Sequence, residues 1–370
     1  MTRRSILFCM RFADDQGFVW RTVVDLRDRV ARLLPDYDCF VAFPKLTGNT
    51  AHAPKHLQPV ELDCYRLSNT DKRALGSFVE RSDTAAMVYM SALPTTLDMR
   101  FLRSLGVATI NTEEDSFDHS QHDGLPKRLA KFVTRRLLKR QLHTLHIANS
   151  PSQGVWLRSY ACIPDERLIV IPNGIDTERF SPAERTEHED LHVLCAGQAR
   201  SEKRIDTVIR CAARIFAQPE FDGTTFTYVG DGPMMVEWQA EADRLGLRER
   251  FLFAGAQADL VPVYRASDIF VHAAERESFG LVIAEAMACG LPVVASAAAG
   301  PSEIVEDGAT GALIPVEDEH AFQAAIESYL RDPARIRAHG HAARERAVEH
   351  YAMERQAHDM AAAIRSAIED

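Results

Sequence analysis

The sequence predicts an α/β fold made of two doubly wound domains, each with a parallel sheet covered by helices. Short apolar runs alternate with longer amphipathic stretches, which is typical of buried parallel strands joined by helices. The length of 370 residues also exceeds the roughly 250 to 300 residues that one hydrophobic core supports. In chain order, the apolar runs are SILFCM, CFVAF, AAMVYM, VATIN, LIVIP, HVLCAG, FTYVG, FLFAG, IFVHA and PVVAS.

Turn residues interrupt this alternation at Ile171–Asp176, and a charged stretch follows at 184–190. We therefore expect domains at residues 1–172 and 173–350, followed by a C-terminal helix at 351–370 that can pack back on the first domain. Because each half has its own series of strands and helices, two Rossmann-like domains should face each other across a cleft. In open sheets of this kind, ligands bind outside the carboxyl ends of the strands.

Composition and charge exclude several classes of function. The 53 acidic residues outnumber the 43 basic ones, which gives a net charge of −10 and disfavours nucleic acid as a partner. The seven cysteines include no CxxC pair, so neither a disulfide framework nor a zinc site is expected. The first apolar run reads as a buried strand, and no run is long enough to span a membrane. We expect a reduced, cytoplasmic protein that requires no metal.

A candidate anion site follows the predicted strand DIFVHA in the second half. The segment 272–290 reads as a loop and a helix, with Ser278 as the helix N-cap. The first backbone N–H groups and the positive end of the helix dipole would suit a diphosphate. Gly280 lets a phosphate approach the backbone, and Phe279 can screen the site from water. The expected donor-binding residues are Ser278, Phe279, Gly280, Leu281 and Val282.

Two glutamates flank this predicted helix start. Glu277 lies on the loop just before the anion site, where its carboxylate can accept hydrogen bonds from sugar hydroxyls. Glu285 lies about two helical turns further on, where it can accept from a ribose diol. A charge-assisted bond of this kind is worth roughly 1.5 to 3 kcal/mol. The alternative is structural, with Glu277 stabilising the helix dipole and Glu285 on a solvated face.

The two glutamates belong to a longer pattern, which reads Glu277-Ser-Phe-Gly-Leu-Val-Ile-Ala-Glu285-Ala-Met-Ala-Cys-Gly290. It is accompanied, in order, by the segments IPNGID from Ile171, VGDGP from Val229, FAG from Phe253 and GPSEIVEDG from Gly300. On these motifs the chain resembles, from Ile171 to about Val316, the retaining GT-B glycosyltransferases of glycosyltransferase family 4. The resemblance implies a nucleoside diphosphate sugar as donor and transfer with retention at the anomeric carbon.

In that family, a Gly-Arg-Leu turn and a lysine five residues after the arginine normally bind the donor diphosphate. The equivalent stretch here is Gly197-Gln-Ala-Arg-Ser-Glu-Lys203. Lys203 is therefore a phosphate-binding and catalytic candidate, with a solvated charge as the alternative. Gln198 replaces the arginine, and the nearby Arg200 is a candidate to compensate for it. The segment 230–232 reads as a turn rather than a ligand site.

The first half carries weaker signals and is expected to hold the acceptor. The resemblance implies a glycine-rich loop after the first strand that approaches the donor phosphates. Gly17 is the one glycine that remains in this stretch. The alternative is a simple turn before a helix. Trp20 and Arg21, near Gly17, are candidates to contact a sugar or a phosphate. The histidine that the family often places after a later strand is absent, because that strand continues as NTEED from Asn111.

His119 is the nearest catalytic candidate to replace that histidine, and His122 follows it, although a surface histidine in a polar loop is the alternative for both. A missing protein base does not exclude activity if the departing phosphate takes the acceptor proton. The carboxylates that could hold acceptor hydroxyls, with solvation as the alternative, are Glu113, Glu114 and Asp115.

A dense basic helix is predicted from Lys127 to Arg140, around an apolar stripe that includes Leu129 and Phe132. Such a face can dock on an anionic membrane surface, which would place the protein peripherally on the inner face of the membrane. The alternative is a solvent-facing helix whose charges are paired.

The main functional hypothesis is a hexosyltransferase that moves a sugar from a nucleoside diphosphate sugar to a hydroxyl of a saccharide or lipid-linked acceptor. Such an enzyme would serve glycan, polysaccharide or glycolipid biosynthesis. Two alternatives stay open: a nucleotide-sugar epimerase on the same fold, which needs no acceptor, and an inactive sugar-nucleotide-binding protein. Neither a GxGxxG nor a GxxxxGK motif follows a predicted strand, which sets dinucleotide dehydrogenases and nucleoside triphosphatases aside.

Overall fold

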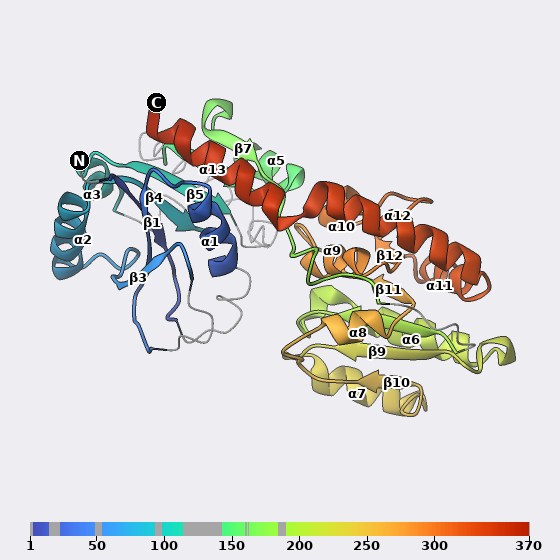
Figure 1. The fold of residues 1–370 in the computed structure, drawn as a ribbon. Helices are drawn as coiled ribbons and strands as arrows, with labels where there is room; N and C mark the ends of the chain where they lie inside the picture. Colours follow the sequence, from blue (N-terminus) through green and yellow to red (C-terminus); the bar gives the residue numbers. More distant parts are fainter. Residues whose placement is uncertain are drawn as a thin grey trace. The chain divides into compact units, whose positions relative to one another are not determined.

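The computed structural model describes residues 3–14, 23–48, 54–92, 98–113, 143–159, 161, 163–183 and 190–369. The chain divides into two units, whose elements are labelled in Figure 1. Unit 1 comprises residues 1–173 together with the C-terminal residues from Met353, and unit 2 comprises Gly174–Ala352. The sequence places this break after residue 172 and starts the C-terminal helix at residue 351.

Unit 1 is built on a seven-stranded parallel sheet with the order β3-β2-β1-β4-β5-β6-β7. The chain runs outward from β1 to β3 and then returns to the other side of β1, so the order reverses between β1 and β4. This is the doubly wound topology that the sequence predicts. The strands are β1 (Ser5–Cys9), β2 (Asp38–Phe43), β3 (Gln58–Glu61), β4 (Thr84–Met90), β5 (Ala108–Glu113), β6 (Leu145–Ala148) and β7 (Leu168–Val170).

Helices cover both faces of this sheet. The C-terminal helix α13 (Met353–Glu369) packs beside α1 (Asp25–Arg32), and Met360 and Ile364 of α13 are buried in the core that these two helices share with the strands. Ion pairs from α1 to Glu354 support this packing, the shortest at 2.5 Å. The remaining described helices of unit 1 are α2 (Asn69–Arg81), α3 (Met99–Ser104), α5 (Pro151–Ser159) and the 3-10 helix η4 (Asp165–Arg167).

Unit 2 repeats this plan with a six-stranded parallel sheet in the order β10-β9-β8-β11-β12-β13. The chain runs from β8 to β10 on one side and from β11 to β13 on the other, so the order reverses between β8 and β11. A ligand of an open α/β sheet binds at such a switch point. The strands are β8 (His192–Ala196), β9 (Thr225–Val229), β10 (Phe251–Phe253), β11 (Ile269–His272), β12 (Val293–Ser296) and β13 (Gly311–Ile314).

Two apolar layers enclose the sheet of unit 2. One layer includes Val208, Trp238 and Phe322 from the helices α6, α7 and α11, and the other includes Ile283 and Ala343 from α9 and α12. These layers fix where the loops at the carboxyl ends of the strands emerge. The helices are α6 (Ile205–Phe216), α7 (Met235–Arg244), α8 (Val261–Arg265), α9 (Leu281–Ala288), α10 (Ala299–Ile304), α11 (Glu319–Leu330) and α12 (Pro333–Tyr351), with the 3-10 helices η5 (Ser201–Lys203) and η6 (Pro219–Phe221).

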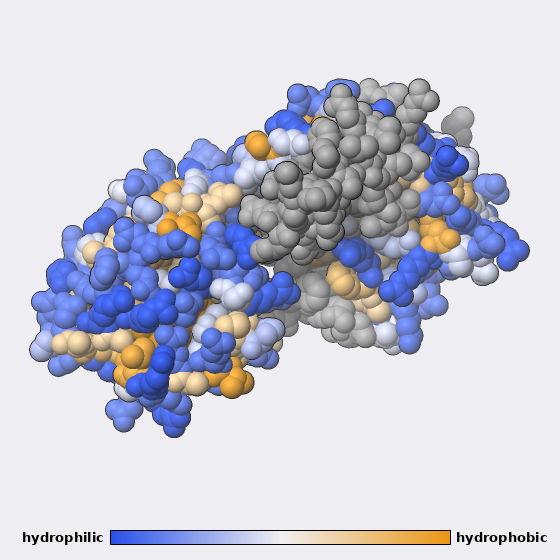
Figure 2. All heavy atoms as spheres, turned by 180° about the vertical axis from the view of Figure 1, so that it is seen from behind, coloured by the Kyte–Doolittle hydropathy of each residue, from blue (hydrophilic) through white to orange (hydrophobic). Residues whose placement is uncertain are grey.

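In the described part of the chain, no helix combines the length and the apolar character that a membrane span requires. On the face drawn in Figure 2, the described surface is mostly hydrophilic, and its hydrophobic residues lie in small separate patches. Isolated apolar residues of this kind are normal on a protein surface.

Candidate functional site

The loops that follow β8 and β11 meet at the switch point of unit 2. The first loop ends in η5 and carries Lys203, and the second carries Glu277 and leads into α9. The Nζ atom of Lys203 lies 2.6 Å from Oε2 of Glu277, a charge-assisted hydrogen bond. The two residues are 74 positions apart in the sequence, so the fold alone brings them together.

Glu277 is a buried carboxylate that keeps its charge. Only 9% of its side chain is exposed, and burial alone would raise its pKa. His272 and the Lys203 ammonium outweigh that effect and lower the pKa of Glu277 to about 2. The His272 Nε2 atom lies 3.5 Å from the same Oε2 atom. The carboxylate is therefore ionised at any physiological pH and can accept hydrogen bonds from a hydroxylated ligand.

The loop that carries Glu277 is held tightly by its backbone. The Gly300 N–H donates to the Glu277 carbonyl at 2.8 Å, and the Glu275 N–H donates to the Glu202 carbonyl at 3.0 Å. A Cβ atom at position 300 would lie 2.3 Å from the Phe279 carbonyl oxygen, so only glycine allows this approach. These contacts set the position of the Glu277 carboxylate before any ligand arrives.

The start of α9 differs from the prediction. Gly280, with φ of +104°, is the N-cap residue, and α9 begins at Leu281, so the prediction of Ser278 as the cap is wrong. The left-handed conformation of residue 280 explains this, because glycine adopts it without strain. Since the Ile283 and Ala284 N–H groups bond to the Gly280 carbonyl, Leu281 and Val282 supply the N–H groups that can receive an anion.

Phe279 lies in the apolar core, not over the anion site. Its side chain is 3% exposed and packs edge-on against Tyr351 at a centroid distance of 5.6 Å. A role for this side chain in screening the site from water therefore has no support in the geometry. Its burial instead anchors the loop that carries Glu277.

Glu285 lies in an environment opposite to that of Glu277. Its Oε2 atom accepts a hydrogen bond from the Tyr264 hydroxyl at 2.9 Å. Burial raises the pKa of Glu285 to about 7, although the Tyr264 hydrogen bond and the Arg179 charge act against the shift. Glu285 is half-buried, so it does not lie on a solvated face. It changes its charge near neutral pH, whereas Glu277 does not.

Gln198 and Arg200 are both exposed on the loop after β8. Between them, Ala199 is fully buried and its N–H donates to the Asp231 carbonyl at 2.8 Å. The segment 230–232 thus packs against this loop as a turn. Arg200 stays a candidate to compensate for the arginine that Gln198 replaces, because its side chain is exposed on the same loop.

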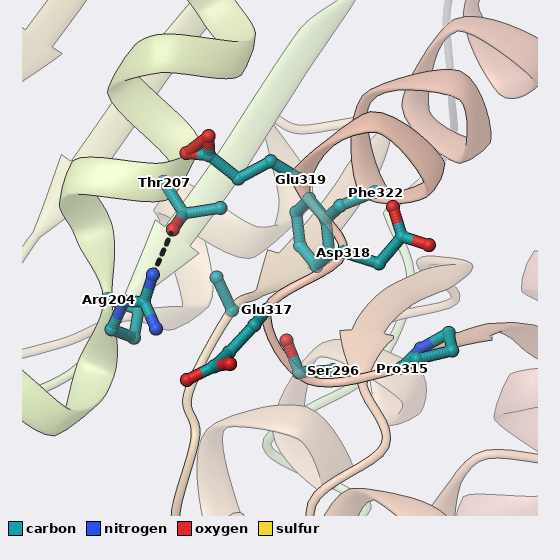
Figure 3. Close-up of a pocket in the computed structure, with 9 residues that line it drawn as sticks. Arg204, Thr207, Ser296, Pro315, Glu317, Asp318, Glu319 and Phe322 are labelled. Carbon is teal, nitrogen blue, oxygen red and sulfur yellow. Dashed lines mark hydrogen bonds between the residues drawn. The ribbon is translucent and has the colours of Figure 1, made fainter.

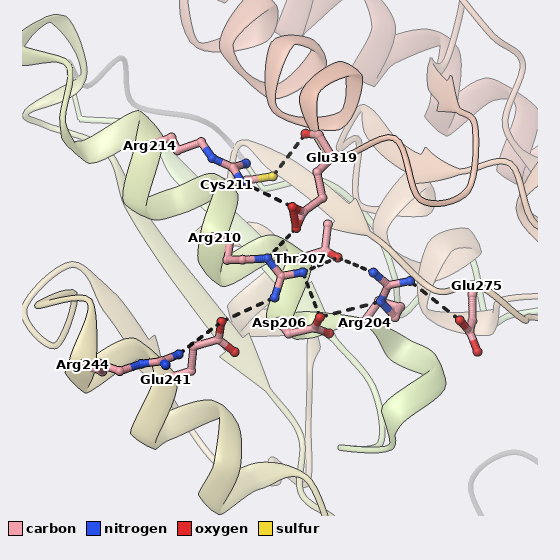
Figure 4. A network of polar contacts seen from close by, with 10 residues as sticks. All are labelled: Arg204, Asp206, Thr207, Arg210, Cys211, Arg214, Glu241, Arg244, Glu275 and Glu319. Atoms are coloured by element: carbon pink, nitrogen blue, oxygen red, sulfur yellow. Dashed lines mark hydrogen bonds and ion pairs between the residues drawn. The ribbon is translucent and has the colours of Figure 1, made fainter.

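A polar network stabilises the turn that carries Lys203 (Figure 4). Arg204 adopts a left-handed conformation with φ of +51° and donates to Thr207 Oγ1 at 3.2 Å. Its other terminal nitrogen lies 3.7 Å from a carboxylate oxygen of Glu275. Arg210 joins α6 to α11 through Glu319 at 2.5 Å. The network holds η5 against the loop that carries Glu277.

A small pocket lies beside this network, with Arg204 and Thr207 on one side and the segment 317–319 on the other (Figure 3). Its volume of about 10 Å³ has room for about one water molecule. Asp318 accepts from the Ala321 N–H at 2.9 Å and so caps α11. The pocket is too small for a nucleotide sugar, and its lining serves the network.

In unit 1, Glu113 is the one described residue among the predicted site candidates. It lies at the end of β5, is 6% exposed and accepts from Asn111 Nδ2 at 3.4 Å. The predicted candidates outside the described residues are Gly17, Trp20, Arg21, Glu114, Asp115, His119, His122 and the basic segment from Lys127 to Arg140.

Sequence reasoning missed His272, which lies beside Glu277, and Tyr264, which bonds to Glu285. It also missed Arg204, which lies near Glu275 on the loop that carries Glu277. His272 had a detectable signal, because it is a polar residue at the end of an otherwise apolar strand run. The structure also shows no group of three or more His, Cys, Asp or Glu side chains placed to hold a metal ion, as far as its described residues go.

Comparison with known proteins finds a family match in unit 2. Residues 176–346 match the family model described as glycosyl transferases group 1. The chain is 33% identical over 216 residues to the lipopolysaccharide core biosynthesis mannosyltransferase LpcC of Rhizobium leguminosarum bv. viciae, covering 54% of this chain and 60% of that protein. A D-inositol 3-phosphate glycosyltransferase of Mycobacterium sp. (strain KMS) is 34% identical over 208 residues, covering 52% and 46%. The matched part thus spans about half of these relatives' lengths.

Solved structures match both units. A glycosyltransferase from Rickettsia africae ESF-5 has a TM-score of 0.81 at 14% identity and covers 100% of both chains. HepE from Anabaena, in complex with UDP and glucose, has a TM-score of 0.78 at 20% identity and covers 98% of this chain and 100% of that chain. These likenesses show the GT-B fold that the sequence predicts. Together, the match to glycosyl transferases group 1 and the GT-B fold support a glycosyltransferase.

Proposed function

We propose that this chain transfers a hexose unit from a nucleoside diphosphate sugar to a hydroxyl acceptor, with retention at the anomeric carbon. One observation carries the proposal: at the switch point of unit 2, Lys203 Nζ lies 2.6 Å from the Glu277 carboxylate, beside the start of α9. This arrangement combines a cation and helix N–H groups for a diphosphate with a carboxylate for sugar hydroxyls. The glycosyltransferase names of the relatives and the UDP complex of HepE agree with a donor of this class.

In the proposed reaction, negative charge develops on the departing diphosphate. Lys203 and the N–H groups of Leu281 and Val282 stabilise that charge, and preorganised groups of this kind commonly supply the largest catalytic contribution. Glu277 orients the sugar through its hydroxyls, and Glu285 accepts from the ribose diol. Gln198 and Arg200, which are exposed on the loop after β8, also contact the donor.

The bond between the anomeric carbon and the diphosphate oxygen breaks as the acceptor oxygen bonds to the same face of that carbon. The acceptor proton passes to the departing phosphate oxygen, so atoms and charges balance without a protein base or a redox partner. The proposal includes no metal, because Lys203 and the N-terminus of α9 provide positive charge. In this scheme His119 is a candidate to contact the donor sugar rather than an essential base.

The proposed acceptor is a hydroxyl of a saccharide or of a lipid-linked saccharide, in glycan, polysaccharide or glycolipid biosynthesis. The name of LpcC refers to lipopolysaccharide core biosynthesis, which agrees with an acceptor of this class. A lipid-linked acceptor would place the protein on the cytoplasmic side of a membrane, where the basic segment from Lys127 to Arg140 would meet anionic headgroups. Sedimentation with anionic vesicles at low salt tests this, and absence of binding contradicts it.

The donor is tested first, with a panel of nucleoside diphosphate sugars in a thermal shift assay. A donor present at 100 times its dissociation constant should stabilise the protein by about 2.7 kcal/mol. We expect one base and one sugar to give the largest shift. Failure of every donor to shift the transition would contradict the proposed function.

The largest expected effect is that of Glu277→Gln, which should lower transfer from the selected donor at least about a hundredfold, or about 2.7 kcal/mol. Glu237→Gln removes the same charge from the exposed part of α7 and should leave transfer unchanged. Equal activity in both variants would contradict the role of Glu277. Conversion of the donor into another nucleotide sugar without an acceptor would favour the epimerase alternative, and donor binding without any product would favour the inactive binding protein.

A further inference from the structure

His272 is the last residue of β11, a central strand of the sheet of unit 2. Its side chain is 4% exposed, and its ring stacks on Phe270 with a centroid distance of 6.4 Å. The buried Nε2 atom has no hydrogen-bond partner at normal bonding distance. The nearest carboxylate is that of Glu277, whose Oε2 atom lies 3.5 Å away. A buried polar atom without a partner is costly, so its retention needs a reason.

The described side-chain contacts of the Glu277 carboxylate involve only one of its two oxygens. Lys203 Nζ and His272 Nε2 both approach Oε2. Among the described residues, no side chain is in hydrogen-bonding contact with Oε1. Oε1 is therefore the atom that can accept from a ligand hydroxyl, provided that Oε2 stays fixed. In this structure Lys203 Nζ holds Oε2 at 2.6 Å, and His272 Nε2 lies further away at 3.5 Å.

A bound diphosphate changes which groups hold Oε2 of Glu277. The Lys203 ammonium can pair with the Glu277 carboxylate or turn to a phosphate, and the two negative groups then compete for it. When Lys203 turns to the phosphate, it weakens its hold on Oε2. His272 is then the donor that remains beside this oxygen, and a gap of 3.5 Å closes with a small rotation of the carboxylate. Hydrogen bonds in ligand-free sites are often long and tighten only when the ligand is bound.

We propose that His272 is a positioning residue: its Nε2–H group holds Oε2 of Glu277, so that Oε1 faces the sugar hydroxyl while Lys203 binds the diphosphate. This inference rests on the proposed function. Burial lowers the pKa of His272, so its ring is neutral and carries one N–H group. A neutral donor suits this role because it orients the carboxylate without neutralising its charge.

The test compares His272→Leu, which removes the donor, with His272→Gln, whose side-chain amide can place an N–H group where Nε2 lies. UDP-glucose and GDP-mannose serve as probes, and release of the nucleoside diphosphate is measured. We expect His272→Leu to lower kcat about tenfold, or about 1.4 kcal/mol, with a smaller effect on KM. His272→Gln should recover most of that loss. A role in packing alone predicts equal losses in both variants, because neither retains the ring.

A double-mutant cycle with Glu277→Gln separates positioning from packing. If His272 acts through the Glu277 carboxylate, His272→Leu should have little further effect on a protein that already carries Glu277→Gln. In labelled protein without ligand, the NMR signals of His272 should show the Nε2–H tautomer, and Glu277→Gln should shift them. Additive losses, or unchanged signals, would overturn the role of His272. A wild-type protein that neither binds nor cleaves either probe would instead overturn the proposed function itself.

Discussion

The two sheets bury polar groups in different ways. Unit 2 has a charged set at its switch point, where Lys203 and the neutral His272 both approach one carboxylate oxygen of the buried Glu277. In unit 1 a row of neutral groups crosses the strands, where Asn111 lies beside Tyr89 on one side and His146 on the other, although Arg27 and Glu113 are also buried in this unit. Charged groups are costly to bury even when paired, so their retention favours a functional role. Neutral polar groups cost less to bury than charged ones.

Histidines show the contrast most directly. In unit 1, neither ring nitrogen of His146 has a hydrogen-bond partner, and burial lowers its pKa to about 3. Nε2 of the neighbouring His143 donates to the Ala92 carbonyl at 2.9 Å, and burial lowers the pKa of His143 to about 4. Both rings are therefore neutral. In unit 2, His272 faces an ionised carboxylate instead. Burial alone thus does not distinguish a structural from a functional histidine, but the group that it faces does.

Removing the cation from the charged set should have the largest effect within this comparison. Lys203→Ala should lower donor cleavage at least about a hundredfold, because the departing diphosphate loses its stabilising charge. It should also raise the pKa of Glu277 from about 2, because burial raises this pKa and the Lys203 charge would no longer counteract it. Steady-state kinetics on the donor selected by the panel measures the first effect.

The control for this substitution is Lys203→Arg, which keeps the positive charge on a different geometry. It should retain more activity than Lys203→Ala. Equal losses in the two variants would show that the shape of the side chain, not its charge, matters at this position. The charged set of unit 2 would then not differ from the neutral row of unit 1 in the way proposed.

The two glutamates of unit 2 should differ in their response to pH. The pKa of Glu285 is raised from 4.5 to about 7, so this carboxyl accepts ribose hydroxyls as an anion only above that value. Donor affinity should therefore rise with pH by up to about 25-fold between pH 5.5 and 7.5. Glu277, with its pKa near 2, contributes nothing in this window. Calorimetric titration of the donor at several pH values measures the effect.

Glu285→Gln should make the affinity independent of pH in this range. The same shift has the opposite sign for stability: between pH 4.5 and 7 the folded protein binds a proton that the unfolded chain does not. The contribution of Glu285 to stability is thus present below pH 4.5 and is lost as pH rises through 7. An affinity that stays pH-dependent in Glu285→Gln would contradict this assignment.

Most of the fold could be predicted from local patterns. Apolar runs such as SILFCM and IFVHA became the buried strands β1 and β11, because each run has the length of one strand and its polar residue lies at one end of the strand. The helix start at Gly280 could not be predicted by the usual preference for serine. Residue 280 has a left-handed conformation next to the point where α10 packs against the loop that carries Glu277. These contacts form only in the folded chain.

The candidate site was predictable as a set of residues but not as a geometry. The pattern around Glu277 and Glu285 identified both carboxylates but not their opposite pKa shifts. Burial raises the pKa of Glu285, whereas His272 and the distant Lys203 outweigh burial and lower the pKa of Glu277. Local spacing carries no information about burial or about a distant partner such as Lys203. In unit 1 the carboxylate candidates, such as Glu114 and Asp115, were chosen from polarity, and polarity in a loop does not distinguish a ligand contact from a solvated side chain.

The smallest expected effect tests whether the contrast between the histidines is real. His146→Leu replaces a buried ring that makes no hydrogen bond with an apolar side chain of similar size, so the unfolding free energy should stay the same or rise by about 1 kcal/mol. Donor cleavage should be unchanged, whereas His272→Leu should slow it about tenfold. Denaturant unfolding and donor kinetics on the two variants provide the measurement. A loss of donor cleavage in His146→Leu would mean that the neutral row of unit 1 also supports the reaction, and the distinction drawn from charge would fail.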